Sequence, residues 1–196
     1  MKSLFFSTIL VFAVFFNTSA TANDAPLWNI DNFHSNIAFT INHYFTPIPG
    51  TFHDFGGVIR FDPANLAGSE IDVVVQVASV DTNVGNRDNH LRTDDFFDAA
   101  TYPEMRFRST DIRATGDNTF VAVGMLTIKD VTREVELPFE LTGVTADLRN
   151  PDVTRAGLVG NIKLNRLDFG VGVGNFASTA VIGNEVNINL FLQVYN

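Results

Sequence analysis

The sequence contains no cysteine among its 196 residues. Disulfide bonds and a lipid-attached cysteine are therefore excluded, and the chain must be stabilised by packing alone. Zinc or copper ligands would have to come from the four histidines His34, His43, His53 and His90. None of these pairs with another at i, i+2 or i+4, so we expect no metal site.

Long hydrophobic runs are also missing, apart from the largely apolar stretch between Leu4 and Phe16 that follows Lys2. It is too short for a stable membrane span, which needs about 20 residues. With the small residues Ala20 and Ala22 behind it, it predicts a secretory signal peptide over residues 1–22. The alternative is an uncleaved anchor helix. We expect one domain over residues 23–196, located in the periplasm and without stable membrane insertion after cleavage.

Basic residues are scarce: 13 Lys and Arg stand against 22 Asp and Glu, which gives a net charge of −9. An acidic domain of this kind is repelled by nucleic acid and by anionic membrane surfaces. We therefore expect no nucleic-acid partner.

Phenylalanine is the abundant aromatic, with 19 residues against one Trp and three Tyr. Phe lacks a polar group and is suited to dry interior surface. Composition leaves open whether this surface is a packed core or the wall of a cavity.

Apolar residues alternate with polar ones at period two, as Val135, Leu137, Phe139 and Leu141 do. This pattern indicates half-buried strands, and similar runs predict about eight of them. Turn signals occur at residues 47–50, 62–65, 115–118, 129–130 and 149–152. The glycine-rich run 170–175 predicts a bent connection before the last strand.

One short helix is expected in residues 87–100, where Thr93 offers an N-cap ahead of Phe96 and Phe97. The fold class is therefore all-β and antiparallel. Strand patterning alone allows a closed barrel or two packed sheets.

Catalytic signatures are missing as well: the chain has no Gly-x-Ser-x-Gly elbow and no His-Glu-x-x-His motif. We accordingly predict a protein that is not an enzyme and that needs no cofactor.

The segment from Val77 to Phe107 contains Arg87-Asp88-Asn89-His90-Leu91, then Asp95-Phe96-Phe97-Asp98, then Tyr102-Pro103. This order resembles the signature of the YceI family. Further similar features are Trp28-x-Ile30-Asp31, Gly124-x-Leu126-Thr127-Ile128 and Arg166-x-x-Phe169-Gly170, so the resemblance covers the whole chain after the signal peptide.

The resemblance implies an eight-stranded antiparallel, lipocalin-like barrel with a long apolar pore, and a possible homodimer. It also implies a carrier of a long-chain isoprenoid lipid, either quinone-like or prenyl-phosphate-like. The alternatives are a carrier of another long-chain lipid such as a fatty amide, and an accessory protein in lipid-quinone redox metabolism.

Two sets of residues are candidates for ligand binding. The predicted apolar wall comprises Phe39, Phe52, Phe55, Phe97, Phe107, Phe139 and Phe169. The predicted polar contacts are His43, Arg87, His90 and Arg166. For Arg87 a structural role is the favoured alternative, in which Arg87 and Asp88 bind loop backbone or Arg166 and Asp168.

Overall fold

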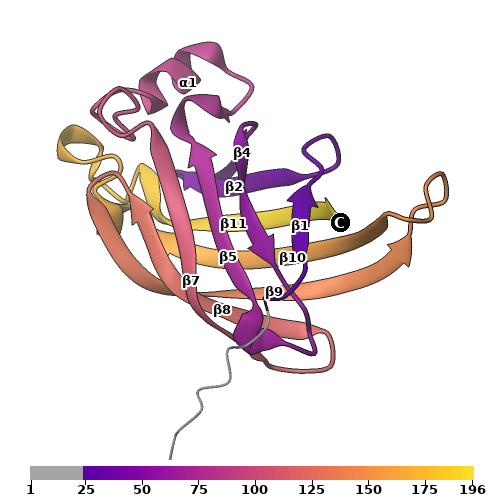
Figure 1. Cartoon of the computed structure of the whole chain (residues 1–196). Helices are drawn as coiled ribbons and strands as arrows, with labels where there is room; N and C mark the ends of the chain where they lie inside the picture. Colours follow the sequence, from indigo (N-terminus) through magenta and orange to yellow (C-terminus); the bar gives the residue numbers. More distant parts are fainter. Residues whose placement is uncertain (1–23) are drawn as a thin grey trace, which may run out of the picture.

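The computed structural model describes residues 24–196 (Figure 1). The predicted signal peptide, residues 1–22, lies outside the described residues. The strands are β1 (Leu27–Ile30), β2 (Asn36–His43), β3 (Thr46–Phe52), β4 (Phe55–Arg60), β5 (Glu70–Gln76), β6 (Val80–Asp81), β7 (Glu104–Ala114), β8 (Thr119–Ile128), β9 (Val131–Ala146), β10 (Thr154–Asn165) and β11 (Ile182–Tyr195).

The sheet closes on itself as a barrel. Strands β1, β4, β5, β7, β8, β9, β10 and β11 follow one another around it, and β1 pairs back onto β11 through Asn29↔Tyr195 and Ile30↔Val194. Towards one end of the barrel, β2, β3 and β6 extend the wall from β11. All the pairings are antiparallel, so the prediction of an eight-stranded antiparallel barrel is confirmed, and the two-sheet alternative is excluded.

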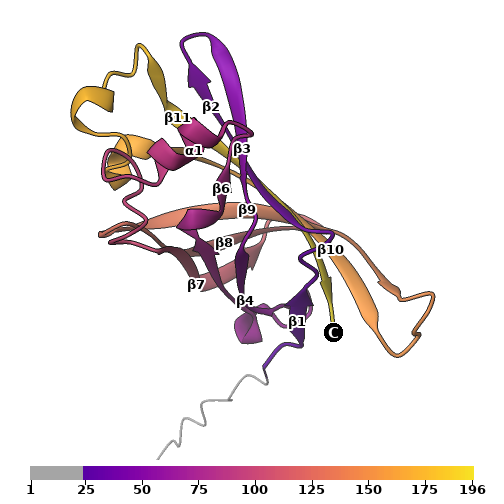
Figure 2. The same ribbon diagram turned by 90° about the horizontal axis from the view of Figure 1, so that it is seen from above.

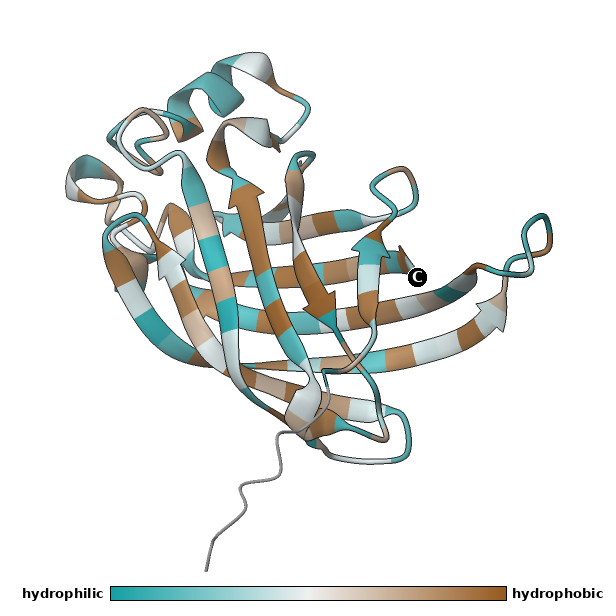
Figure 3. Cartoon of the chain, viewed as in Figure 1, coloured by the Kyte–Doolittle hydropathy of each residue, from teal (hydrophilic) through white to brown (hydrophobic). Residues whose placement is uncertain are grey.

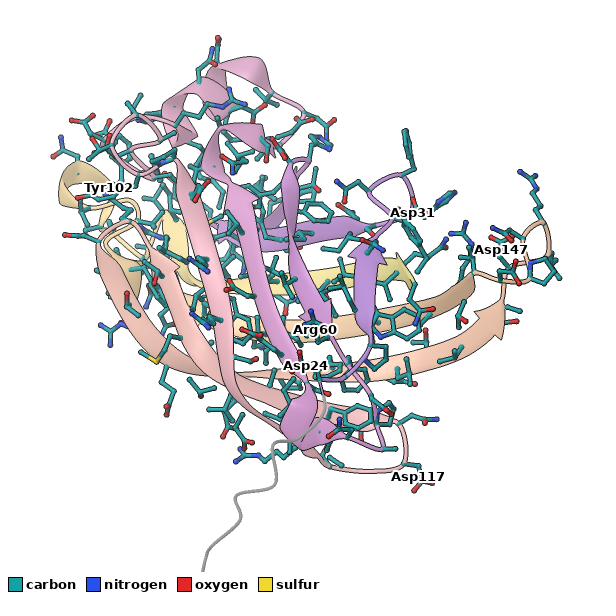
Figure 4. All side chains as sticks on the ribbon, in the orientation of Figure 1. Asp24, Asp31, Arg60, Tyr102, Asp117 and Asp147 are labelled. Carbon is teal, nitrogen blue, oxygen red and sulfur yellow. The ribbon has the colours of Figure 1, made fainter. Side chains whose placement is uncertain are left out.

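The two ends of the barrel differ. In Figure 2 the β2–β3 hairpin, the helix α1 (Gly85–Leu91) and the segment before β11 lie at one end. We call this end the mouth. Figure 4 shows Tyr102 beside it and Asp117, in the β7–β8 turn, at the opposite end.

The helix lies earlier in the chain than predicted. It spans Gly85–Leu91, and residues 93–98 form turns in place of a helix. The hydroxyl of Thr93 donates to the carbonyl of His90 at 2.7 Å, so it closes the end of α1 and does not cap a new helix. The expected N-cap at Thr93 was therefore wrong, although the single short α-helix is present.

The predicted turn at residues 47–50 is a strand. Residues Thr46–Phe52 form β3, which pairs along its whole length with β2, and the chain reverses at Tyr44 and Phe45. Pro47 and Pro49 lie two positions apart, so their missing N–H groups fall on the same side of the strand. A strand tolerates this arrangement at a free edge.

Hydrophobic and hydrophilic residues alternate along the strands, as the banding in Figure 3 shows, and successive side chains of a strand point to opposite faces. Away from the mouth the interior side chains form a packed cluster that includes Trp28, Phe61, Phe120 and Phe139. The indole N–H of Trp28 donates to the Phe61 carbonyl at 2.9 Å, which satisfies its one polar group. Outward positions carry ion pairs such as Arg106–Asp72 and Lys163–Glu185.

Candidate ligand-binding site

The barrel encloses an apolar cavity of about 540 Å³. Its wall includes side chains from every strand of the closed barrel except β1, and from β2, β3, α1 and the loops of the mouth. At the far end the cavity reaches Phe139, which packs with Phe61 at a ring-centroid distance of 5.3 Å and with Phe120 at 5.4 Å. Neither Phe61 nor Phe120 lines the cavity, so Phe139 forms its floor and the other two rings pack behind it.

The structure brings nearly all the predicted site residues together around this cavity. The wall contains Phe39, His43, Phe52, Arg87, His90, Phe97, Phe107, Phe139, Arg166 and Phe169. Phe55 is the exception. It lies opposite Val75 in the sheet register, but it is buried in a cluster with Ile37, Phe52 and Val80 and does not reach the cavity. The expectation that Phe55 lines the cavity was therefore wrong, because its own neighbours cover it.

Two aromatic wall residues lie against glycines of the neighbouring strand. A Cβ on Gly50 would lie 2.3 Å from the ring of Phe39, and a Cβ on Gly124 would lie 2.7 Å from the ring of Phe107. The missing side chains let the rings lie flat against the wall. A larger residue at Gly50 would push the Phe39 ring into the cavity, and one at Gly124 would also collide with the Arg108 backbone oxygen, 2.4 Å from its Cβ.

Polar groups on the wall lie mainly towards the mouth. Arg87 donates from Nε to the hydroxyl of Thr82 at 2.6 Å and from Nη2 to the Thr82 carbonyl at 2.7 Å. The buried carboxylate of Asp88 accepts hydrogen bonds from the Thr82 backbone N–H at 2.8 Å and from its hydroxyl at 2.5 Å. Arg87 and Asp88 thus tie α1 to the end of β6. This agrees with the structural role favoured from the sequence: both side chains bond the backbone of Thr82, and Arg166 and Asp168 are not their partners.

Arg166 holds the rest of the mouth together. Its side chain is 5% exposed and donates to the carbonyl oxygens of five residues: Val171, Gly172, Phe176, Ile182 and Gly183. Burial lowers the pKa of the Arg166 guanidinium below its ordinary value, because desolvation disfavours the charged form. These bonds fasten the bent segment before β11, where Gly170, Gly172 and Gly174 all have positive φ angles. The predicted bent connection is thereby confirmed.

His90 lies edge-on against two aromatic rings, with centroid distances of 5.0 Å to Phe96 and 4.8 Å to Phe176. A ring nitrogen of His90 also hydrogen-bonds Asp95 at 2.9 Å. Phe96, Phe176 and Thr82 line the cavity but were not predicted to do so. They lie in short or irregular elements, where no period-two pattern marks an inward face.

Within the part of the chain that the structure describes, no group of three or more His, Asp or Glu side chains is arranged to hold a metal ion. No helix among residues 24–196 has the length and apolar character needed to span a membrane.

The barrel and its cavity have counterparts in known proteins. A family model for the YceI-like domain matches residues 28–194. The chain belongs to the YceI family. The resemblance seen in the sequence is thereby confirmed over nearly the whole of the described barrel.

Proteins with similar sequences include a UPF0312 protein of Vibrio parahaemolyticus. It is 33% identical over 189 residues and covers 96% of this chain and 97% of its own. The crystal structure of Burkholderia cenocepacia BcnA superposes with a TM-score of 0.77 at 28% identity, over 84% of this chain and 98% of its own. A polyisoprenoid-binding domain from Saccharophagus degradans superposes with a TM-score of 0.67 at 17% identity, over 85% of this chain and 97% of its own. At that identity the last likeness shows the fold alone.

Proposed function

We propose that this protein binds a long-chain isoprenoid lipid, quinone-like or prenyl-phosphate-like, inside the barrel and carries it through the periplasm. The observation that carries the proposal is the apolar cavity, whose volume of about 540 Å³ falls within the ordinary range of ligand sites. The S. degradans domain, which shares this barrel fold, is itself a polyisoprenoid-binding domain, so a barrel of this fold can hold this class of ligand.

The physical reason for such a cavity is the cost of exposing a hydrocarbon chain to water. Each methylene that leaves water gains about 0.8 kcal/mol, so a chain of tens of carbons needs a dry, matching enclosure. The wall offers aliphatic side chains from β10 and β11 and flat rings from β2, β3 and β7. A hydrophobic wall of this kind discriminates weakly between similar chains. A fatty amide or another long-chain lipid is therefore the alternative cargo.

A binding role is favoured over catalysis because the buried polar side chains of the wall, Arg166 and Thr82, are engaged in hydrogen bonds of the fold. Arg166 donates five bonds to carbonyls, and Thr82 is bound by Arg87 and Asp88. The alternative is an accessory protein in lipid-quinone redox metabolism. Such a protein would bind its lipid in the same cavity, and it would differ from a carrier in the partner with which it exchanges the lipid. The periplasmic location is proposed from the signal-like N-terminal sequence, and cell fractionation would test it.

Native mass spectrometry of the protein purified from its own host, followed by solvent extraction, tests the proposal. We expect a co-purifying long-chain lipid, and the native mass also reports whether the protein is a dimer. A cavity that stays empty after incubation with polyprenol or ubiquinone would refute the carrier role. Conversion of added quinone would favour the redox alternative.

A further inference from the structure

The mouth of the barrel has an uncharged side. It consists of the β2–β3 turn and strand β3, residues 44–52, and of the segment that leads into the first residues of β11, residues 170–184. Neither stretch contains a charged residue, although charged residues make up 18% of the chain. The two stretches lie together, since the backbone N–H of Tyr44 donates to the Val181 carbonyl at 2.7 Å. We call them the uncharged rim.

The uncharged rim exposes large apolar side chains beside the cavity. Phe45 is 97% exposed, and Tyr44 and Val173 are also exposed. His43 and Val171, which line the cavity, lie within two residues of them along the chain. A molecule that leaves the cavity through the mouth therefore passes close to these side chains.

The hairpin turn is unusual in its residues as well as in its exposure. Tyr44 has a φ of 53°, in a two-residue turn where Gly, Asn or Asp is the usual choice. A bulky residue is strained in this region of backbone conformation. Tyr44 is held there by the bond to Val181 and by an edge contact with His43, at a ring-centroid distance of 4.9 Å. Turn geometry therefore does not select Tyr44, and packing does not select the exposed Phe45.

The remainder of the mouth is different. Apart from the buried Asp88, helix α1 and residues 92–98 carry Arg87, Arg92, Asp94, Asp95 and Asp98. A protein partner that covered the whole mouth would have to meet these charges. The uncharged rim alone matches a neutral lipid surface, where aromatic side chains insert readily at the boundary between headgroups and acyl chains.

We propose that the uncharged rim docks on a lipid bilayer, with Phe45 and Tyr44 inserted, so that the cavity opens towards the membrane while a lipid is exchanged. This inference rests on the proposed function, because docking on a bilayer would serve a protein that exchanges lipid with it. Insertion is driven by apolar contact and not by charge. It therefore needs no anionic lipid in a chain whose net charge is −9.

Sedimentation of the purified protein with phosphatidylcholine vesicles tests docking without any cargo. We expect Phe45→Ser to weaken vesicle partitioning about tenfold or more, as expected for removal of a buried Phe from the apolar phase. Phe33→Ser is the matched control. Phe33 is 98% exposed, but it lies at the other end of β2, about 25 Å along the strand. Both variants should melt like the wild type.

Equal losses in the two variants, or a wild type that does not bind vesicles, would overturn the proposal. Binding that requires phosphatidylglycerol and disappears in high salt would overturn it too, as would a cross-linker at position 45 that captures a protein in place of lipid. Loss of vesicle binding in Phe45→Ser with unchanged lipid retention would support it. Because empty protein is used, this test is independent of whether the cavity holds an isoprenoid.

Discussion

Arg166 Nη1 donates a 2.6 Å hydrogen bond to the carbonyl of Gly172, a residue whose φ of 71° few side chains tolerate. A Cβ at Gly172 would lie 2.4 Å from that same nitrogen. The arginine can reach the loop only because the loop has no side chain there. The mouth of the cavity therefore depends on an Arg and a Gly together.

Replacing Arg166 with Met should destabilise the protein by about 3 kcal/mol or more, because several buried carbonyls lose their donor. Arg166→Lys should recover little of this, since an ammonium group cannot reproduce the planar fork. Urea denaturation measures the effect. Arg133→Met is the control. Exposed Arg133 makes one 2.8 Å bond to the Asp168 carbonyl, so its replacement should lower the free energy of unfolding by about 1 kcal/mol or less. Equal losses at the two positions would contradict the assigned role.

Gly172→Ala and Gly174→Ala separate backbone strain from crowding. Both residues have positive φ, but a Cβ at Gly174 meets nothing within 4 Å, whereas one at Gly172 meets Arg166 and Phe96. Gly174→Ala should cost about 1 kcal/mol from strain alone. Gly172→Ala should cost at least twice as much in the free energy of unfolding. Comparable values would show that the loop shifts freely.

Acid should remove a stabilising contribution from Asp147. Hydrogen bonds from Arg155 and from the backbone N–H groups of Arg149 and Asn150 lower the pKa of Asp147 from 3.8 to about 2. A carboxylate whose folded-state pKa is depressed stabilises the fold above the unfolded value and loses that stability as pH falls through the folded value. The stability difference between wild type and Asp147→Asn should therefore be largest above pH 4 and shrink towards pH 2. Urea midpoints from pH 5 to pH 2 would show this; a difference that is constant with pH would refute it.

Filling the cavity should displace cargo without harming the fold. Ile162 lines the cavity from β10, while its neighbour Lys163 points outward and pairs with Glu185 at 2.9 Å. Ile162→Trp should reduce the lipid extracted per protein severalfold and change stability by only about 1 kcal/mol. Lys163→Trp adds the same ring to the outer face and should retain lipid normally. Undiminished lipid in Ile162→Trp would place the cargo elsewhere.

Replacing Arg87 with Ala separates a head-group contact from the structural role. The loss of two bonds to Thr82 should lower stability by about 1–3 kcal/mol. Lipid retention should be unchanged if the role is structural only. Weaker retention with unchanged melting would instead assign Arg87 to the lipid head group.

Local sequence determined much of the barrel. Period-two alternation predicted the inward faces of β9 and β11, and the Lys129-Asp130 pair predicted the β8–β9 turn, where Lys129 has a φ of 56°. These features depend on neighbours along the chain, so the amino-acid order is sufficient to predict them.

At the mouth two local signals were misleading. Thr93 had the chemistry of an N-cap, yet α1 lies before it, over Gly85–Leu91, where Arg87 and Asp88 bind Thr82. The prolines of β3 predicted a turn, yet pairing with β2 keeps that segment extended.

The amino-acid order by itself thus determined the family, the antiparallel strands and ten of the residues that line the cavity, because inward and outward positions alternate along each strand. Only the tertiary structure decided that the strands enclose a cavity, that Phe55 is covered by its neighbours, and that the donors of Arg166 are all directed at backbone carbonyls. Those outcomes depend on how side chains from separate strands share one interior volume, which no single segment specifies.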